Sequence, residues 1–254
     1  MMSGYVRFYD FFADFDHDVP FYRRLALEAR GPVLDLGCGS GRVSVPLARA
    51  GARVTGLDLD PGMLELAHAR ATAAGIADSL RWVQGDMTRF RVDDEFALAI
   101  CPANTLLCLR SRTAQELSIG TAAGHLATGG RIAVDVFHPP IYLADHPADG
   151  VRRVLRQGID PGSGRPARWT VSVRHSVSAQ VLVAANEIEV FGEGGAVERH
   201  PFEEVLRYCH RAELELLFEK CGLEVEAVHG WFDGRGFDDT ARKIVLVARK
   251  KPRG

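Results

Sequence analysis

The sequence predicts an α/β fold built on a parallel sheet, interrupted late in the chain by an antiparallel segment. In the first half, short apolar stretches alternate with stretches of helical pattern, which is typical of repeated strand–helix units. After about residue 142, apolar and polar residues instead alternate one by one, as in a half-buried strand. The 254 residues are enough for a single domain with such an insertion.

Five strands are predicted in the first half, at 33–36, 53–57, 80–84, 96–101 and 131–137. Three helices connect them. The helix 42–50 ends at Gly51, which suits a left-handed terminus, and the helix 61–74 follows Asp60, a good capping residue. A third helix opens on a capping box at Thr113 and stops before Gly129 and Gly130.

The antiparallel insertion is predicted at 142–208, with its strands from about Val151 on. Strict alternation over 169–177 and turn clusters at 160–164 and 192–195 define its long strands. We expect it to roof a substrate cleft, to pair two subunits, or both. A helix ending at Gly222 and two strands at 223–228 and 243–248 complete the chain.

Composition limits the function classes. The 31 basic and 33 acidic residues leave a formal charge of −2, which disfavours a nucleic-acid partner. No apolar run approaches a membrane span, and the first residues lack a signal pattern. The five cysteines are scattered and form no C-x-x-C pair, so neither a disulfide framework nor a metal site is indicated. We expect a reduced cytoplasmic enzyme.

The most informative segment, 33–41, reads VLDLGCGSG. Glycines at this density stand where the backbone must approach a ligand closely. A dinucleotide site requires a further glycine at the position of Arg42, and the lysine of a P-loop is also missing. The turn therefore predicts a nucleoside ligand without a pyrophosphate.

Three carboxylates lie at predicted strand ends, where open α/β sheets bind ligands. Asp58 ends the second strand and can accept two hydrogen bonds from a ribose diol. Asp86 follows the third strand and can accept from an adenine amino group, or it is a plain turn residue. Asp35, before the turn, is expected to brace the glycine loop. Met63 either covers the adenine ring or belongs to the core.

Together these motifs resemble the class I S-adenosylmethionine-dependent methyltransferases of the small-molecule type. The resemblance rests on VLDLGCGSG (33–41), GLDLDPGML (56–64), GDM (85–87), the stretch 97–109, FDG (232–234) and the closing 242–250. It implies a Rossmann-like seven-stranded, mostly parallel sheet with helices on both faces and an antiparallel last strand beside strand five. Trp231 departs from the pattern, since similar sequences often carry a small or acidic residue there.

The resemblance also implies the site. The glycines approach the methionyl tail of S-adenosylmethionine, Asp58 the ribose, and Asp86 with Met87 the adenine. The residues predicted to bind this cofactor are Asp35, Gly37, Cys38, Gly39, Gly41, Asp58, Leu59, Met63, Asp86, Met87 and Pro102.

The acceptor side is predicted from fewer signals. His138 follows strand five and is either a general base or a loop histidine bonded to backbone. His175 is in phase with the apolar face of its strand and is read as a core residue. Segment 5–22 carries eight aromatic residues among four aspartates, within an N-terminal segment 1–30 that is either a lid or a packing helix. The residues predicted to bind the acceptor are Tyr9, Tyr22, Asn104, His138 and Tyr208.

The function predicted is methyl transfer to a nitrogen or oxygen of a small acceptor, such as a sugar or secondary metabolite. A nicotinamide-dependent oxidoreductase, a nucleic-acid methyltransferase and a non-catalytic cofactor-binding protein are the alternatives. If the N-terminal segment is a lid, its acidic residues favour a cationic or amine-bearing acceptor.

Overall fold

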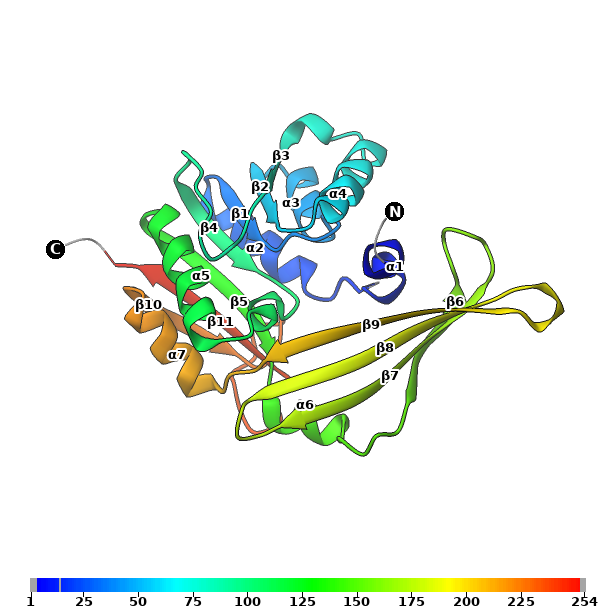
Figure 1. Cartoon of the computed structure of the whole chain (residues 1–254). Helices are drawn as coiled ribbons and strands as arrows, with labels where there is room; N and C mark the ends of the chain where they lie inside the picture. The colour runs from blue at the N-terminus through cyan, green and yellow to red at the C-terminus, as the bar shows by residue number, and fades with distance from the viewer. Residues whose placement is uncertain (1–3, 14, 252–254) are drawn as a thin grey trace.

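The computed structural model describes residues 4–13 and 15–251 and contains two sheets (Figure 1). The larger sheet has the strand order β10-β11-β5-β4-β1-β2-β3. Its strands are β1 (Val33–Leu36), β2 (Val54–Asp58), β3 (Leu80–Gln84), β4 (Phe96–Cys101), β5 (Leu126–Phe137), β10 (Leu223–His229) and β11 (Lys243–Lys250). The smaller sheet contains β6 (Arg153–Ile159), β7 (Pro166–Ser176), β8 (Val181–Phe191) and β9 (Val197–Arg207) in sequence order.

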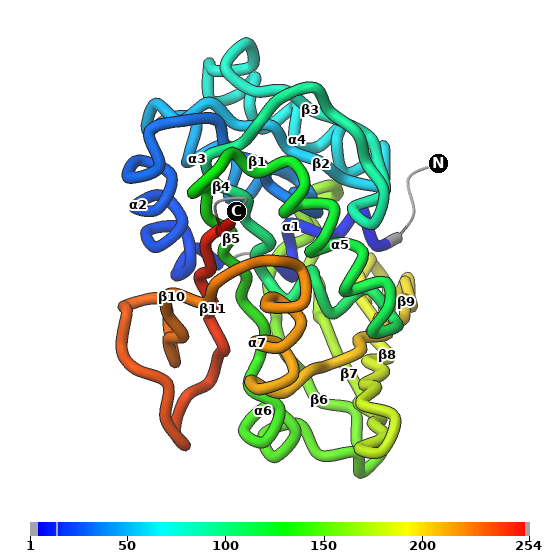
Figure 2. Tube along the Cα trace, turned by 90° about the vertical axis from the view of Figure 1, so that its left-hand side faces the viewer, coloured from blue at the N-terminus to red at the C-terminus, as the bar shows by residue number. Residues whose placement is uncertain are grey.

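Helices cover both faces of the larger sheet. They are α1 (Gly4–Phe12), α2 (Val19–Ala29), α3 (Ser44–Arg49), α4 (Pro61–Ala73), α5 (Arg112–His125), α6 (Pro139–Asp145) and α7 (Arg211–Lys220). Short 3-10 turns lie at η1 (Ala77–Ser79), η2 (Thr105–Cys108) and η3 (Glu193–Gly195). Figure 2 shows α2 on one side of the sheet and α5 and α7 on the other.

The expected strand order is confirmed. Strand β11 runs antiparallel between β5 and β10, while β1, β2, β3, β4 and β5 pair in parallel. The last strand is therefore inserted beside strand five, as the resemblance implies. This arrangement places the carboxyl ends of β1, β2, β3, β4 and β5 along one edge, where the loops that follow them can form a site.

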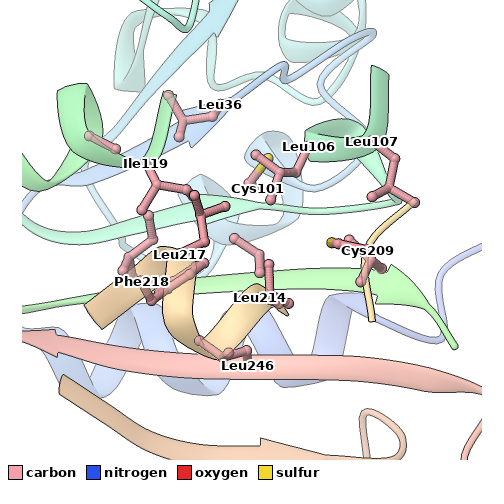
Figure 3. Packing of buried hydrophobic residues seen from close by; sticks show 14 of the residues in the cluster. Leu36, Cys101, Leu106, Leu107, Ile119, Cys209, Leu214, Leu217, Phe218 and Leu246 are labelled. Carbon is pink, nitrogen blue, oxygen red and sulfur yellow. The ribbon is translucent and has the colours of Figure 1, made fainter. Parts of the chain in front are cut away.

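The core divides along the two faces of the sheet because successive strand residues point to opposite sides. One cluster includes Leu25 of α2 and Leu47 of α3, which pack with Val33 and Ile100. Figure 3 shows the other cluster, in which the fully buried Phe218 of α7 and Ile119 of α5 pack toward Leu36 and Leu246.

Two element boundaries were predicted wrongly. Helix α5 begins at Arg112 and is capped by Ser111, whose Oγ accepts from the Ala114 N–H at 3.1 Å, so Thr113 is not the cap. Strand β5 starts at Leu126 and runs through Gly129 and Gly130. These glycines form an irregularity in the pairing with β4 instead of ending the strand.

The insertion is a four-stranded antiparallel meander that extends away from the larger sheet in Figure 1. Helix α1 packs on it through aromatic contacts. Phe12 stacks on Phe202 of β9 with ring centroids 5.4 Å apart, and Arg7 forms an ion pair with the buried Asp160 at 3.1 Å. The first helix and the insertion thus form one layer, which we call the roof. Asp14, one of the aspartates of the aromatic segment, lies outside the described residues.

The described residues contain neither a membrane-spanning helix nor a cluster of metal-binding side chains. No helix in this part of the chain is long and apolar enough to cross a bilayer. No cluster of three or more His, Cys, Asp or Glu side chains within 4–13 and 15–251 could hold a metal ion.

Candidate active site

A cavity of about 270 Å³ lies at the carboxyl edge of the larger sheet, between the strand ends and the roof. Its walls come from α1, the loops after β1, β2 and β3, and η2. The lining residues are Tyr5, Tyr9, Gly37, Gly39, Leu57, Asp58, Leu59, Asp60, Met63, Gly85, Asp86, Met87, Thr105, Cys108 and Leu109.

The glycine turn forms the floor of this cavity. Gly37 and Gly39 have φ angles of +64° and +54°, which side-chain-bearing residues rarely adopt. There is no room for a Cβ either. On Gly37 it would lie 2.3 Å from Thr105 Cγ2, and on Gly39 it would lie 3.0 Å from the Tyr9 hydroxyl. Backbone amides are therefore the surface that a ligand meets here.

Asp58 is held in place by two backbone donors. Its Oδ2 accepts from the Gly39 N–H at 2.8 Å, and its Oδ1 accepts from the Asp60 N–H at 2.9 Å. Burial raises the pKa of Asp58, although these bonds work in the opposite direction. Each oxygen keeps a second lone pair, so the carboxylate can accept a pair of hydroxyl groups.

The other predicted cofactor residues after β2 and β3 meet in the same cavity. Met63 is 3% exposed and Leu59 is 68% exposed, and both line it. Asp86 accepts from the Thr88 N–H at 2.9 Å, and this bond with the Thr88 hydroxyl lowers the pKa of Asp86. Asp60 caps α4 through the Gly62 N–H, as expected, and also faces the cavity.

Four predicted cofactor residues lie outside the cavity lining. Cys38 and Pro102 are buried, and a Cβ on Gly41 would meet Trp82 at 3.1 Å. Asp35 is 1% exposed and its Oδ2 accepts from Ser44 Oγ at 2.6 Å, whereas Oδ1 has no partner among the described residues. Burial raises the pKa of Asp35 to about 7.

Arg42, which replaces the dinucleotide glycine, ties the N-terminal segment to the turn. Its guanidinium donates to both carboxylate oxygens of Asp18, at 2.6 and 2.7 Å, and to the Phe15 carbonyl. Asp18 is 1% exposed, so this is a bidentate pair removed from water. Ser40 of the turn also donates to Asp10 at 2.8 Å. Arg42, which stands where a dinucleotide site needs glycine, thus holds the segment after α1 to the turn. Ser40 holds α1 itself.

The loop after β4 is fixed by a buried charge network. Asp135 of β5 accepts from Lys243 Nζ at 2.7 Å, from the Tyr22 hydroxyl at 2.7 Å and from the Ala103 N–H at 2.8 Å. Burial alone would raise the pKa of Asp135, but these three donors, led by Lys243, lower it. Asn104 Oδ1 accepts from the Phe137 N–H at 2.7 Å.

The residues predicted to bind the acceptor are distributed over four places. Tyr9 lines the cavity. Tyr22 and Asn104 bond within the network around Asp135, and Tyr208 is 1% exposed, with its hydroxyl unpartnered among the described residues. His138 lies outside the lining; its Nδ1 is 2.8 Å from the Ala241 carbonyl, which leaves Nε2 as the free nitrogen.

Comparison with known proteins shows which family the chain resembles. Residues 33–130 match the family model described as a methyltransferase domain. The chain is 26% identical over 219 residues to the Cypemycin N-terminal methyltransferase of a Streptomyces species, covering 86% of this chain and 83% of that protein. The chain belongs to the S-adenosylmethionine-dependent methyltransferases. This methyltransferase is also 28% identical over 207 residues to the dTDP-3-amino-3,4,6-trideoxy-alpha-D-glucopyranose N,N-dimethyltransferase of Streptomyces venezuelae, covering 80% of each.

The fold agrees with this assignment. The structure of the CcbJ methyltransferase from Streptomyces caelestis superposes with a TM-score of 0.79 at 28% identity, covering 93% of this chain and 90% of that one. The methyltransferase uses S-adenosylmethionine as its methyl donor, and the residues present fit that molecule. The glycine floor has no room for side chains, Asp58 is poised for a diol, and Asp86 and Met87 stand at the next strand end.

Several lining residues were not predicted as site residues. Tyr5 and Cys108 reach the cavity from α1 and η2, and Thr105 closes on Gly37. The aromatic density of 5–22 and the motif over 97–109 indicated these segments without identifying the residues. Trp231 stacks on His17 of the N-terminal segment at 5.1 Å and does not line the cavity.

Proposed function

We propose that this methyltransferase methylates an amine nitrogen on a small acceptor such as an amino sugar or a related secondary metabolite. The observation that supports this is the charge of the cavity. Asp58, Asp60 and Asp86 line it, and none of its described lining residues is basic. A site of this charge lowers the free energy of holding cationic groups, namely the sulfonium donor and an ammonium acceptor.

The relatives support the same acceptor class. Of the two proteins compared by sequence, one is named for methylation of an N-terminus and the other for dimethylation of an amino sugar. Both names describe a nitrogen acceptor, and this class of acceptor is what we propose.

The chain's own residues act by binding, orientation and exclusion of water. When bound, S-adenosylmethionine would supply an activated methyl group that a neutral amine can attack in line, with the thioether sulfur as the leaving group. Asp58 and the glycine turn fix the donor end, and the buried network at Asp135 fixes the loop opposite. Tyr5 and Tyr9 of the roof cover the cavity, which excludes water and aligns the reacting groups.

A test compares matched acceptors. The enzyme is supplied with S-adenosylmethionine and either primary amines or their hydroxyl counterparts, and S-adenosylhomocysteine release is measured. We expect turnover of amines and little of the alcohols. Preferred turnover of alcohols would overturn the amine assignment while leaving the methyltransferase identity intact.

A hydroxyl acceptor is the second candidate, and His138 is the residue that favours it. A hydroxyl group gains from a general base, and the free Nε2 of His138 can serve as one. On this alternative, His138→Ala abolishes turnover of the alcohol. For an amine acceptor we expect His138→Ala to retain the parental rate.

We also propose a cytoplasmic location and a homodimer formed through the insertion. All five cysteines are free thiols, which suits a reducing compartment. Edge strand β6 exposes Val154, Leu155 and Ile159 at 51%, 44% and 58%, a row of apolar side chains suited to strand pairing. Sedimentation velocity of the wild type and of Val154→Lys tests the dimer, since the charge should dissociate it.

A further inference from the structure

Glu204 is an acidic residue of β9, in the part of the insertion sheet that packs against the cavity wall. Phe202, two residues earlier on the same strand, contacts Tyr5 of the cavity with ring centroids 5.5 Å apart. Residues two apart on a strand point to the same face. Glu204 therefore faces the side of the sheet that roofs the site, and β9 also packs against η2, which supplies Cys108.

The charge of Glu204 acts on groups from three other elements. It contributes to the raised pKa of Tyr5 on α1, of Cys108 on η2, at about 11, and of Tyr142 on α6, at about 12, where burial is the larger cause. Tyr5 and Cys108 line the cavity. Glu204 therefore lies close to α1, η2 and α6, where the roof meets the larger sheet.

Within residues 4–13 and 15–251, Glu204 has no cationic partner, unlike the other enclosed glutamates of this region. Glu189 pairs with Arg168 at 2.6 Å and Glu213 pairs with Arg207. Among the described residues, the only hydrogen-bond donor to Glu204 is the Asn186 amide, which reaches Oε2 at 3.2 Å.

The position of Asn186 is itself fixed. Its Oδ1 accepts from Trp169 Nε1 at 2.9 Å, and its amide also donates to the Ala184 carbonyl. Glu204 is thus held by a neutral, buried and oriented donor. A half-buried carboxylate without a cation is costly to the folded protein unless a ligand compensates its charge.

We propose that Glu204 binds the ammonium group of the acceptor and takes the proton that this group must lose. The inference rests on the proposed amine acceptor and assigns a residue to it. In the balanced step, one N–H proton passes to the carboxylate and the nitrogen lone pair forms the new N–C bond. The C–S bond breaks with its electron pair on sulfur, giving a neutral thioether, a protonated Glu204 and an N-methylated ammonium.

The experiment uses the full-length enzyme and three amine probes. These are 3-amino-3-deoxy-D-glucose, alanyl-alanine and dTDP-3-amino-3,4,6-trideoxy-α-D-glucopyranose. Glu204→Gln keeps the Asn186 contact geometry but removes the charge. We expect KM for the best probe to rise at least ~10-fold, the loss of one charge-assisted contact. Calorimetry on the enzyme saturated with S-adenosylhomocysteine should show the same loss of amine affinity, with S-adenosylhomocysteine affinity unchanged.

Two variants serve as controls. Glu203→Gln changes the neighbouring, exposed glutamate on the opposite face of β9 and should leave KM within twofold of the wild type. Glu204→Asp keeps the charge and should recover part of the lost affinity.

The outcomes separate the two claims. If the wild type methylates an amine and Glu204→Gln binds it equally well, the role of Glu204 is wrong and the amine acceptor stands. If Glu204→Gln weakens S-adenosylhomocysteine binding as much as amine binding, its role is structural and the inference is also wrong. If the wild type methylates none of the amines and only alcohols, both claims fall.

Discussion

Two buried carboxylates on the same face of the larger sheet behave in opposite ways. Asp35 lies on β1, next to its last residue and before the glycine turn, and Asp135 lies on β5 beside the loop after β4; their exposures are 1% and 0%. The pKa of Asp35 is raised to about 7, whereas the pKa of Asp135 is lowered. Burial acts in the same direction on both, so the difference arises from their partners.

The partners differ in charge and in distance along the chain. Asp35 receives a bond from the Ser44 hydroxyl, nine positions away, and meets no lysine or arginine within salt-bridge distance among the described residues. Asp135 receives bonds from Lys243, Tyr22 and the Ala103 N–H, and the lysine is 108 positions away. A buried acidic group is charged or neutral according to which distant side chain the fold brings to it.

Removing the lysine should make Asp135 resemble Asp35 and is the largest effect we expect. In Lys243→Met, a fully buried carboxylate loses its cation, which typically costs about 3–5 kcal/mol of unfolding free energy. Urea unfolding at pH 7 measures it. The control is Lys220→Met, an exposed lysine whose partner Glu116 is only half-buried, with an expected change under about 1 kcal/mol. Equal effects of the two variants would contradict the importance of burial.

Asp35 should instead produce a loss of stability with rising pH. Its folded pKa of about 7 exceeds the unfolded value of 3.8, so the native state binds more protons between about pH 4 and 7. The contribution of Asp35 to stability is therefore fully present below about pH 4 and is lost across this window, by about 4 kcal/mol for a shift of about three units. Urea unfolding of Asp35→Asn at pH 4, 5.5 and 7 should lack this fall. Parallel curves for wild type and variant would show that Asp35 does not titrate there.

Asp58 is a third kind of carboxylate. Backbone N–H groups hold it in place, and each of its oxygens can still accept a hydrogen bond from a ligand. Asp58→Ala should weaken S-adenosylhomocysteine binding about 100-fold, the loss of charge-assisted bonds to a ribose. Calorimetry measures this, with NAD as a ligand that should not bind. The matched control is Asp60→Ala, in the same cavity, which removes the α4 cap at a cost of about 1 kcal/mol in stability and should leave affinity within threefold. Similar affinities for the two variants would refute the ribose assignment.

The predicted cofactor residues that line the cavity were recognisable from sequence because they follow strand ends within one continuous segment. The glycine turn, Asp58 and Asp86 all lie between residues 33 and 87, and the parallel strands that carry them are recognisable from local pattern. The fold class and the insertion were predictable for the same reason. The boundaries that failed, at Ser111 and Leu126, depend on which of several competent residues caps a helix and on whether two glycines break or bend a strand.

The network around Asp135 and the position of Glu204 could not be predicted because both depend on pairing between distant strands. Lys243 reaches Asp135 only because β11 is inserted beside β5, where Lys243 pairs with Phe137 and Val245 pairs with Asp135. Glu204 faces the site only in the register that places Phe202 against Tyr5. The local sequence around these residues does not indicate their partners. The aromatic residues of the N-terminal segment indicated that it packs on another part of the protein, but not on which part.

Two tyrosines predicted to bind the acceptor give the smallest expected effects and the sharpest contrast. The Tyr22 hydroxyl donates to Asp135, whereas the Tyr208 hydroxyl is buried and has no partner in the described part of the chain. Removing a bond to a charged group should cost about 1.5–3 kcal/mol in Tyr22→Phe, while Tyr208→Phe removes an unsatisfied polar atom and should be neutral or stabilising. Urea unfolding separates the two. If both tyrosines serve the fold, KM for the acceptor stays at the parental value in both variants. A raised KM with unchanged stability would return either tyrosine to the acceptor site.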